Sequence, residues 1–388
     1  MITEFLSGEF GIRELADQYE VSRKTVYQWS GRYEAGGWDG LKDQSRAPHV
    51  HPNAVTLEIE HQLLAFKAAK PLWGAPKLRH KLLGRLGVEA GPAESTVRAI
   101  LRRHGLSARQ GRARRAVPRE PPFAHCQGAN QVWGADFKGW FRTGDGQKCT
   151  PLTLSEAHSR YLLCCQGLAE ATGFVTVQPL FIQTFREKGR PQALRTDNGP
   201  PFASTSLGGW TALSVWWVRL GMGLERIAPG CPQPNGRHER MHRTLKAATA
   251  SPAAGGRRAP QQAFDRFRQE YHEERPHEAL GQQPPASVSA PSARAYPERL
   301  PDQRGYPDEW EKRKVRQGGQ IKWKGRDIRL SEALWGQEIG LEALGEGLWG
   351  IHFETLRLGT FDEREGRIER CARLPPRPAE AGRGSEDE

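Results

Sequence analysis

The feature that most constrains the fold of this chain is an alternation of strand-like and helix-like runs in its middle part. Short apolar runs of four to eight residues are separated or followed by longer stretches with helical periodicity. Such alternation favours an α/β layer fold. We place this predicted domain at residues 123–290, and its strand-like runs are Gln131–Phe137, Cys149–Ser155, Tyr161–Leu168 and Ala193–Thr196.

The first 46 residues have the pattern of a helix-turn-helix unit. Ile12, Leu15 and Ala16 follow helical spacing, a short turn comes next, and Ser22 can cap a second helix. That helix would direct Val26, Trp29 and Tyr33 to the core. Its polar face would carry the predicted DNA contacts Arg23, Lys24 and Gln28. A plain helical hairpin is the alternative interpretation.

A second all-α unit is predicted over residues 52–106. A long helix spans about 57–69, another opens at Trp73–Leu78, and a capped third helix follows Pro92, with Arg98 and Arg102 facing outward. We interpret it as a second, winged-helix-like DNA-binding unit. Residues 107–122 are rich in arginine and contain almost nothing to bury, which predicts a basic linker that is either a solvated tether or a phosphate contact.

The C-terminal part is predicted to be a small β-barrel. A Pro-, Ala- and Ser-rich linker at 291–308 leads to residues 309–364, where polar and apolar residues alternate at Gln320–Leu330 and again at Leu348–Phe353. The tail, residues 365–388, is charged and proline-rich, which is typical of a disordered segment.

The overall charge points to a nucleic-acid partner. The chain has 57 Lys and Arg against 45 Asp and Glu, a formal charge of +12, and basic proteins favour polyanions. No apolar run reaches the roughly 20 residues that a membrane helix needs, so we expect no membrane contact and a cytoplasmic, nucleoid-associated protein. The six cysteines lack zinc-ligand spacing, and we expect them to be reduced and mostly buried.

Three acidic residues stand in settings that suggest catalysis. Asp136 lies in an apolar strand, where a carboxylate is costly to bury; Asp197 ends a strand-like run before an Asn-Gly turn; Glu239 lies at the start of a helix. Two strand-end aspartates and one helix glutamate can meet in one cleft. Hard divalent cations take oxygen ligands, and a pair of them promotes in-line phosphoryl transfer.

The helix that carries Glu239 is strongly basic. We predict that its cations hold the phosphates beside the scissile bond. These residues are Arg237, Arg240, Arg243 and Lys246. His238 and His242 lie four apart on the same helix, and without a third ligand we predict DNA contact or simple polarity for them rather than metal binding.

The region from Gln131 to Leu280 resembles the catalytic core of retroviral integrases and of the related bacterial insertion-sequence transposases. The resemblance implies an RNase H-like core with a mixed sheet, a DDE triad of Asp136, Asp197 and Glu239, and two Mg²⁺ or Mn²⁺ ions bound by the triad. The matching motifs are Trp133 with Asp136, His158–Tyr161, Arg195–Gly199, Pro234–Arg240 and Tyr271–His277. We interpret Arg275-Pro276-His277 as structural support for the core.

The chain departs from that family in several places. Between Asp197 and Glu239 lie 41 residues (239 − 197 − 1), more than the roughly 35 that the family has, and the extra length falls near 207–217. Its tryptophans, Trp210, Trp216 and Trp217, are predicted to pack in a core or interface rather than stack on bases. Glu156 stands where the family has Asp and is not assigned to the metal site. The N-terminal zinc module of retroviral integrases is absent, and the start at Met1 suggests lost residues.

These features together predict a transposase. It would bind double-stranded DNA at terminal inverted repeats, cleave the ends, join them to target DNA, and act as a homo-oligomer because two ends are joined together. Two alternatives remain open: a catalytically silent DNA-binding derivative of a transposase, and another RNase H-like nuclease. Mg²⁺-dependent nicking separates the first from the prediction, and strand joining separates the second.

Overall fold

The computed structural model describes residues 1–43, 54–88, 91–107, 123, 125–137, 139–142, 146–169, 172–226, 236–249 and 258–370. The chain divides into two compact units, Met1–Leu57 and Glu58–Glu388. Each unit is described by itself. No helix in the described ranges combines the length and the apolar character needed to cross a bilayer. The predicted basic linker at 107–122 lies almost wholly outside these ranges.

The first unit is a small three-helix fold. Its helices are α1 (Ile2–Ser7), α2 (Ile12–Gln18) and α3 (Arg23–Gly40). The Ser22 hydroxyl accepts a hydrogen bond from the Thr25 amide at 3.1 Å, so the predicted N-cap is confirmed. Leu15, Ala16 and Val26 form the buried core. Trp29 and Tyr33 were predicted to join that core, but they are only partly buried, because the small unit has too few apolar neighbours to cover them.

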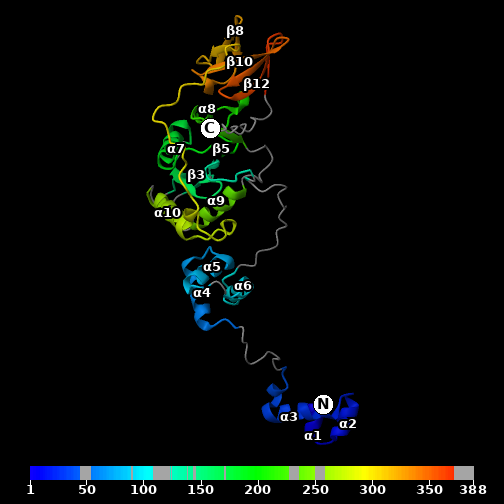
Figure 1. Cartoon of the computed structure of the whole chain (residues 1–388). Coiled ribbons are helices and arrows are strands. Elements are labelled where there is room, and N and C mark those ends of the chain that lie inside the picture. Colours follow the sequence, from blue (N-terminus) through cyan, green and yellow to red (C-terminus); the bar gives the residue numbers. More distant parts are fainter. Residues whose placement is uncertain are drawn as a thin grey trace, which may run out of the picture. The chain divides into compact units, whose positions relative to one another are not determined.

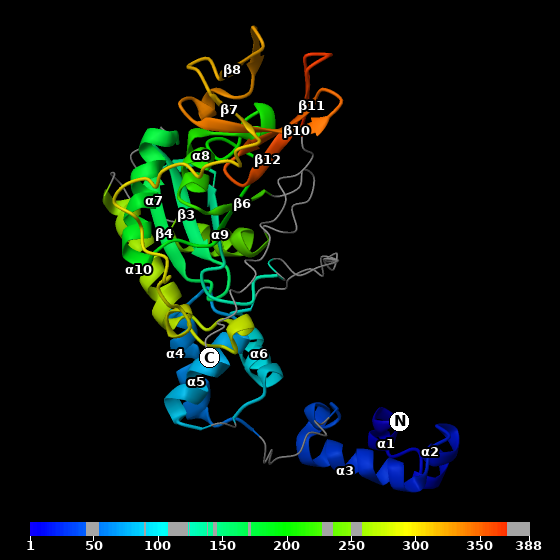
Figure 2. The same cartoon turned by 45° about the horizontal axis from the view of Figure 1, so that its top comes forward.

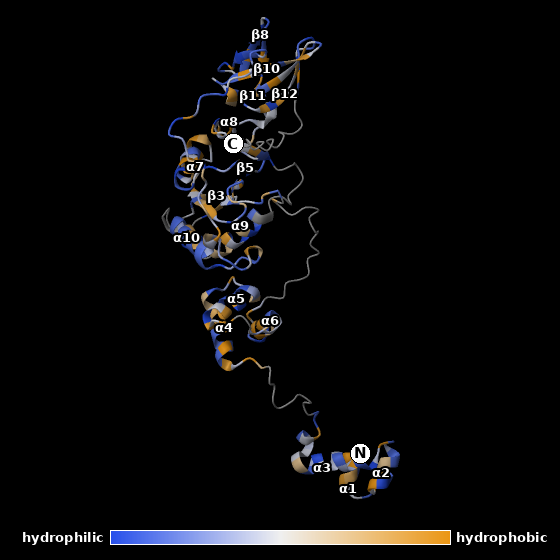
Figure 3. Cartoon of the chain, in the orientation of Figure 1, coloured by the Kyte–Doolittle hydropathy of each residue, from blue (hydrophilic) through white to orange (hydrophobic). Residues whose placement is uncertain are grey.

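The second unit opens with three more helices. These are α4 (Leu57–Ala69), α5 (Ala75–Leu86) and α6 (Glu94–Arg103). Hydrophobic and hydrophilic residues alternate along them (Figure 3), and Leu63, Leu78, Leu82, Val97 and Ile100 are buried. The N-cap of α6 is Ala93, whose side chain cannot accept a hydrogen bond, so the predicted side-chain cap is wrong. The second unit thus opens with three helices, the number predicted for residues 52–106.

The α/β region is built on a mixed sheet of six strands. Their spatial order is β2-β3-β1-β5-β6, with β4 also paired to β3. β1 runs antiparallel to β3 and parallel to β5, and β5 is parallel to β6. The predicted mixed sheet is confirmed. The strands are β1 (Val132–Phe137), β2 (Phe141–Arg142), β3 (Lys148–Glu156), β4 (Leu162–Leu168), β5 (Ala193–Thr196) and β6 (Gly223–Arg226).

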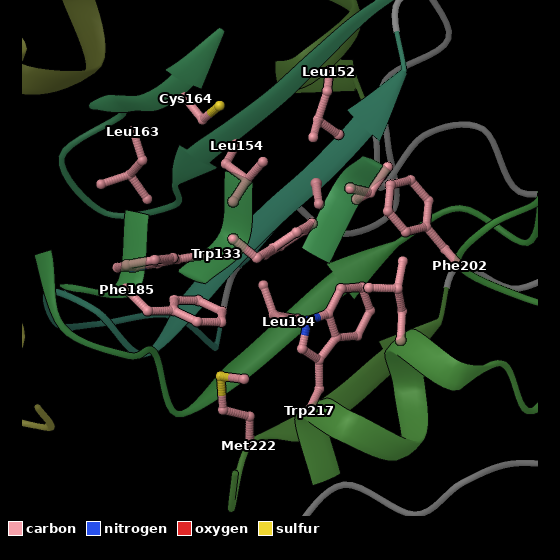
Figure 4. Packing of buried hydrophobic residues seen from close by; sticks show 14 of the residues in the cluster. Trp133, Leu152, Leu154, Leu163, Cys164, Phe185, Leu194, Phe202, Trp217 and Met222 are labelled. Carbon is pink, nitrogen blue, oxygen red and sulfur yellow. The ribbon is translucent and has the colours of Figure 1, made fainter. Parts of the chain in front are cut away.

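Helices cover both faces of this sheet (Figures 1 and 2). On one face, α7 (Phe174–Lys188) and α8 (Ala212–Arg219) bury a large aromatic core that includes Trp133, Phe185 and Trp217 (Figure 4). On the other face, α9 (Gly236–Thr249) and α10 (Arg258–Gln269) pack through Met241, Leu245, Phe264 and Phe267. Short helical turns follow or connect these elements: η1 (Leu207–Gly209), η3 (Glu270–Glu274), η4 (Glu278–Leu280) and η5 (Pro285–Ser287).

The extra length near 207–217 forms η1 and α8. Trp216 and Trp217 belong to the aromatic core, and Trp210 packs edge-on against Phe353 with ring centroids 5.4 Å apart. All three indoles are less than 10% exposed. The prediction that they pack in a core is therefore confirmed, and base stacking is excluded. Because α8 covers the face opposite α9, the insertion leaves the α9 face undisturbed.

The C-terminal strands form open sheets. Five strands pair in the order β13-β12-β11-β10-β7, and β8 and β9 form a separate hairpin. The pairing leaves β13 and β7 as edges, so within the described residues no closed barrel forms, and the predicted barrel is corrected to two sheets. The outer side of α8 supplies Val215 and Val218 to their hydrophobic core. The elements are β7 (Glu311–Lys314), β8 (Gln320–Trp323), β9 (Arg326–Arg329), η6 (Glu332–Leu334), β10 (Glu338–Gly345), β11 (Leu348–Phe353), β12 (Leu356–Asp362) and β13 (Arg367–Arg370).

Two predicted irregular segments are ordered where the structure describes them. The segment 291–308 lies against the α/β region: the Ser292 amide donates to the Lys188 carbonyl at 2.7 Å, and the Arg294 guanidinium donates to the Gly221 carbonyl, also at 2.7 Å. The tail predicted to be disordered from residue 365 instead begins with β13, which pairs with β12. Backbone pairing outweighs the charged composition there; residues 371–388 lie outside the described ranges.

Candidate active site

Two of the three predicted catalytic acids share one pocket. Asp136 and Glu239 line an open pocket of about 490 Å³ beside the end of β1 and the first turns of α9. The Asp136 side chain is 13% exposed, whereas Glu239 lies on the exposed side of α9. The remaining lining residues are Phe137, Gly139, His242, Arg243 and Lys246. The pocket therefore combines carboxylates with cations, as a site for a metal and a phosphate requires.

Two histidines hold α9 in register against the sheet. His238 Nε2 lies 3.1 Å from the Ser155 hydroxyl, and one turn later His242 Nε2 lies 2.7 Å from the Thr153 hydroxyl. Ser155 and Thr153 are themselves two residues apart on β3. Four helical residues advance about 6 Å, and two strand residues advance nearly the same distance, so each histidine meets its own hydroxyl.

This network reaches Asp136 directly. Asp136 is the β1 partner of Thr153, whose hydroxyl donates to the Asp136 backbone carbonyl at 3.1 Å. Nδ1 of His242 lies 3.7 Å from the Asp136 carboxylate. The side chains of His238 and His242 are buried, and burial lowers the pKa of His238 to about 4. Both rings are buried against β3, where they pair with the Ser155 and Thr153 hydroxyls, and His242 also lines the pocket.

Gly134 permits the close approach of α9 to β1. A Cβ atom at this position would lie 2.5 Å from Cε1 of His238, far inside van der Waals contact. Gly134 is two residues before Asp136, so both point to the same face of the sheet. A glycine is therefore needed at 134 for the helix that carries Glu239 to lie beside the strand that carries Asp136.

Asp197 lies at the end of the strand next to β1. The parallel register pairs Ala135 with Thr196, and continuing it by one residue puts Asp197 beside Asp136, where adjacent strands are about 5 Å apart. The Asp197 carboxylate accepts a hydrogen bond from the Gly199 amide at 3.2 Å, which stabilises the Asn-Gly turn. Asp197 is half-buried and is not among the residues lining the pocket of Asp136 and Glu239.

The three predicted acids have the right chemistry to bind a hard cation, but their side chains do not lie close enough together to form a metal site. Carboxylate oxygens are the ligands that Mg²⁺ and Mn²⁺ prefer, and two carboxylates face one pocket. Across the described ranges, no three His, Cys, Asp or Glu side chains are grouped closely enough to form a metal site. Asp136 and Glu239 fit such an ion on their chemistry and shared pocket, and Asp197 fits on its strand register.

Glu156, which was not assigned to the metal site, stabilises a turn. It is only 3% exposed. Its carboxylate accepts hydrogen bonds from the amides of Asn130, His158 and Ser159 and from the Ser159 hydroxyl. These bonds occupy its oxygens and stabilise the turn between β3 and β4.

The predicted basic contacts on α9 separate into two groups. Arg243 and Lys246 line the pocket with Glu239, since residues i, i+4 and i+7 share a helix face. Arg240 is exposed but is not among the pocket's lining residues. The side chain of Arg237 lies outside the described part of the structure. Of the three predicted cations whose side chains the structure describes, two therefore face the pocket.

The other predicted DNA contacts are exposed on the helical units. Arg23, Lys24 and Gln28 lie on the outer face of α3, and Arg98 and Arg102 lie on α6. Arg98 forms an ion pair with Glu94 one turn earlier. All five are accessible to a ligand, as a recognition helix requires.

Sequence reasoning missed Thr153 and its hydrogen bond with His242. Histidines spaced four apart on a helix, opposite hydroxyl residues spaced two apart on a strand, are a signal that could have paired them. The signal is weak in one sequence, because nothing there says which strand packs under which helix.

Three family models match consecutive parts of the chain. A homeodomain-like domain matches residues 25–101, an integrase core domain matches residues 220–285, and the C-terminal domain of IS481 family transposases matches residues 311–369. The integrase core match includes Glu239 and all of α9 and α10. The order of the three matches follows the predicted order of helical, α/β and C-terminal β domains.

The chain is also similar to an insertion-element protein and to solved integrase structures. An uncharacterized protein of insertion element IS407 from Burkholderia multivorans is 28% identical over 225 residues, which cover 54% of this chain and 73% of that protein. The catalytic core of HTLV-2 integrase in complex with magnesium has a TM-score of 0.33 at 13% identity, covering 41% of this chain and 95% of that one. The simian T-cell lymphotropic virus intasome in complex with PP2A regulatory subunit B56 gamma has a TM-score of 0.36 at 16% identity, covering 81% and 100%.

The predicted resemblance to bacterial insertion-sequence transposases with an integrase-like core is thus confirmed. The matched domains support a transposase or integrase function and DNA binding through a helix-turn-helix region.

Proposed function

We propose that this chain is a DDE-type DNA transposase. It cleaves DNA ends at the terminal inverted repeats of an insertion sequence and joins the exposed 3′-hydroxyls to target DNA. The observation that carries the proposal is the pocket in which Asp136 and Glu239 face Arg243 and Lys246. Carboxylates for metal ions and cations for phosphates lie there side by side.

Asp136, Asp197 and Glu239 are the proposed ligands of two Mg²⁺ or Mn²⁺ ions. Bound ions of this kind would activate the attacking hydroxyl and stabilise the leaving oxygen of the phosphodiester. Clustered carboxylates repel one another, and a bound cation would offset this repulsion. Glu239 stands on an exposed helix face, where it can approach the aspartates when an ion binds.

The remaining residues of the pocket position the reacting groups. Arg243 and Lys246 would hold phosphates on either side of the scissile bond. His242 and Thr153 keep Asp136 and α9 in fixed relation through their hydrogen bond. Arg23, Lys24 and Gln28 on α3, with Arg98 and Arg102 on α6, would recognise the terminal repeats. Joining two ends calls for a homo-oligomer, acting on nucleoid DNA in the cytoplasm.

A strand-transfer assay tests this function. Duplex oligonucleotides with the flanking genomic ends are incubated with a target plasmid and Mg²⁺, and nicked and joined products are separated on a gel. Glu239→Gln should lower both products on the order of 1000-fold while leaving DNA binding intact, because it removes a proposed metal ligand. The control Glu273→Gln changes an exposed glutamate on η3 and should match the wild type.

The same assay separates the alternatives. A wild-type chain that binds the ends but makes no nick with Mg²⁺ or Mn²⁺ is a silent DNA-binding derivative. A chain that nicks DNA and never joins it is another kind of nuclease. Either result contradicts the proposal.

A further inference from the structure

Three sequence motifs with no part in the proposed chemistry meet at one junction. They are Trp73–Leu78 at the start of α5, His158–Tyr161 between β3 and β4, and Tyr271–His277 at the end of η3. The Leu162 amide donates to His272 Nε2 at 3.1 Å, and Tyr161 stacks on His272 with ring centroids 3.7 Å apart. The Lys77 ammonium donates to the Pro276 carbonyl. The helices α4 to α6, which we call the helical unit, are therefore in contact with the α/β region here.

Ion pairs support the contact on one side of this junction. Lys70 on α4 lies 3.3 Å from Glu270 and 2.8 Å from Glu274, and the Trp73 indole donates to Glu270 at 3.1 Å. These acids are therefore already engaged by the helical unit.

The same junction holds four cations that act on one another, which we call the cationic cluster: Lys77, Arg160, Arg240 and Arg275. Lys77, Arg160 and Arg275 are only partly exposed. In the described part of the chain, no ion pair or side-chain hydrogen bond engages Arg160, Arg240 or Arg275. A partly buried cation without an acidic partner is destabilising.

The cations of the cluster act on each other. Burial, together with the charges of Arg275, Arg160 and Arg240 and against the opposing effect of Glu278, lowers the pKa of Lys77 to about 8. Burial also lowers the pKa of Arg160, with an added contribution from Arg240. Among the described residues, Glu278 acts on Lys77 and Glu270 acts on Arg275, but no ion pair engages Arg160, Arg240 or Arg275, so the cluster is an electropositive site.

A basic pocket in the C-terminal sheets is a useful contrast. It measures about 590 Å³ and is also lined by cations, among them Arg313, Arg316 and Lys322. There Arg313 lies 2.8 Å from Glu311, and Arg316 and Lys322 both approach Asp327, at 3.8 and 3.6 Å. Three of the four cations that line this pocket form ion pairs, whereas among the described residues no ion pair engages Arg160, Arg240 or Arg275 of the cationic cluster.

His277 provides an independent sign that a ligand is missing at the cluster. Its side chain is 9% exposed and packs edge-on against Tyr271 at 4.7 Å. Its Nε2 atom is buried and, among the described residues, has no hydrogen-bond partner. Burial together with Lys77 and Arg275 lowers the pKa of His277 to about 3, so the ring is neutral. In the tautomer that is protonated at Nε2 it can donate to an anion. Buried polar atoms without partners are rare and call for an explanation.

We propose that Lys77, Arg160 and Arg275, with the neutral ring of His277, bind a backbone phosphate of duplex DNA. The identity of the anion rests on the proposed function, in which DNA is the substrate. The location supports DNA over a free anion: Lys77 belongs to the helical unit that also carries Arg98 and Arg102, and Arg240 shares α9 with Arg243 and Lys246. The cluster therefore takes members from the helical unit that carries Arg98 and Arg102 and from the helix that lines the active-site pocket.

The bound phosphate would join the two parts of the molecule. Guanidinium groups bind phosphate in a planar, two-pronged geometry, so Arg160 from the α/β region and Lys77 from α5 could hold the same anion. DNA binding would then strengthen the junction that links recognition to the active site.

The test compares two variants with equal loss of charge. Arg160→Gln with Arg275→Gln removes two members of the cluster, and Arg186→Gln with Arg266→Gln removes two exposed arginines elsewhere on α7 and α10. Fluorescence anisotropy in EDTA measures binding of the full chain to a duplex with the flanking ends and to a scrambled duplex, over a KCl series. Melting temperatures without DNA are recorded for both variants.

We expect the cluster variant to bind both duplexes about 10- to 100-fold more weakly, because phosphate contacts do not depend on sequence. Its plot of log Kd against log [KCl] should lose about one unit of slope for each phosphate contact removed. The melting temperature should stay the same or rise, since repulsion between cations is relieved. Arg160→Lys should keep most of the affinity. The control variant should change Kd by less than about 3-fold.

Several outcomes overturn the inference. A cluster variant that binds like the control, or that keeps the full salt slope, has no phosphate contact at this place. Weaker binding with a lower melting temperature indicates a structural role. Inorganic phosphate that raises the wild-type melting temperature while DNA affinity is unaffected by the variants assigns the site to a small anion. Because binding is measured without metal, a chain that never nicks DNA disproves the proposed function and leaves this test valid.

Discussion

The two faces of the central sheet differ in what they bury. The face under α7 and α8 buries rings and aliphatic chains, among them Trp133, Phe185 and Trp217. The face under α9 also buries apolar side chains, among them Met241 and Leu245, but around Asp136 it buries hydroxyls and imidazoles, through Thr153 and Ser155 with their histidine partners. Strand β1 belongs to both faces, because alternate residues of a strand point in opposite directions. We expect the face under α7 and α8 to contribute more to the free energy of unfolding, and the face under α9 to hold the proposed catalytic groups in place.

Removing a large ring from the apolar face tests this division most strongly. Trp217→Ala should lower the free energy of unfolding by about 3–5 kcal/mol, because it leaves a cavity in a fully buried core. Urea unfolding followed by far-UV circular dichroism measures it. The exposed Trp38→Ala is the matched control and should cost less than about 1 kcal/mol. Equal losses would show that the aromatic core is not the main source of stability.

Acid should weaken the polar part of the molecule at His272. Burial lowers the pKa of His272 from the ordinary histidine value of 6.5 to about 4. Between these values the unfolded chain binds a proton that the folded chain excludes, so the contribution of His272 is complete above pH 6.5. It falls toward pH 4 by roughly 3 kcal/mol.

His272→Gln keeps an acceptor for the Leu162 amide and removes the titration. The variant should therefore lose less stability than the wild type between pH 6.5 and 4, measured by urea unfolding at each pH. Parallel pH profiles for the two proteins would refute the assignment.

The substitution with the smallest expected effect on stability lies beside the pocket of Asp136 and Glu239. Gly134→Ala adds one methyl group that meets His238, and α9 must shift to accommodate it. We expect a loss of about 1–3 kcal/mol in unfolding free energy together with a loss of strand transfer on the order of 100-fold, because small misplacements of reacting groups are costly. Gly173→Ala, where a Cβ meets nothing within 4 Å, is the control. Full activity in Gly134→Ala would show that the α9 register does not matter for catalysis.

Much of the architecture could be predicted from sequence patterns. The alternating runs predicted β1, β3, β4 and β5 to within about one residue, and the amphipathic pattern predicted α4 at its observed bounds. The two-residue strand β2 and the short β6 have too few residues to carry a periodic signal. The barrel was not found, because strand patterns predict strands and not how the outer strands pair.

The sequence alone determined which residues could do chemistry: an acid in an apolar strand, an acid before Asn-Gly and an acid in a basic helix stand out because each is unusual for its local setting. Only the tertiary structure decided where their neighbours lie. Strand register and helix packing bring together residues that are far apart in the chain. Thr153 lies against His242, and Lys77 contacts the Arg275-Pro276-His277 motif. Arg240 is not among the residues that line the pocket. Long-range packing of this kind leaves no periodic trace in a single sequence.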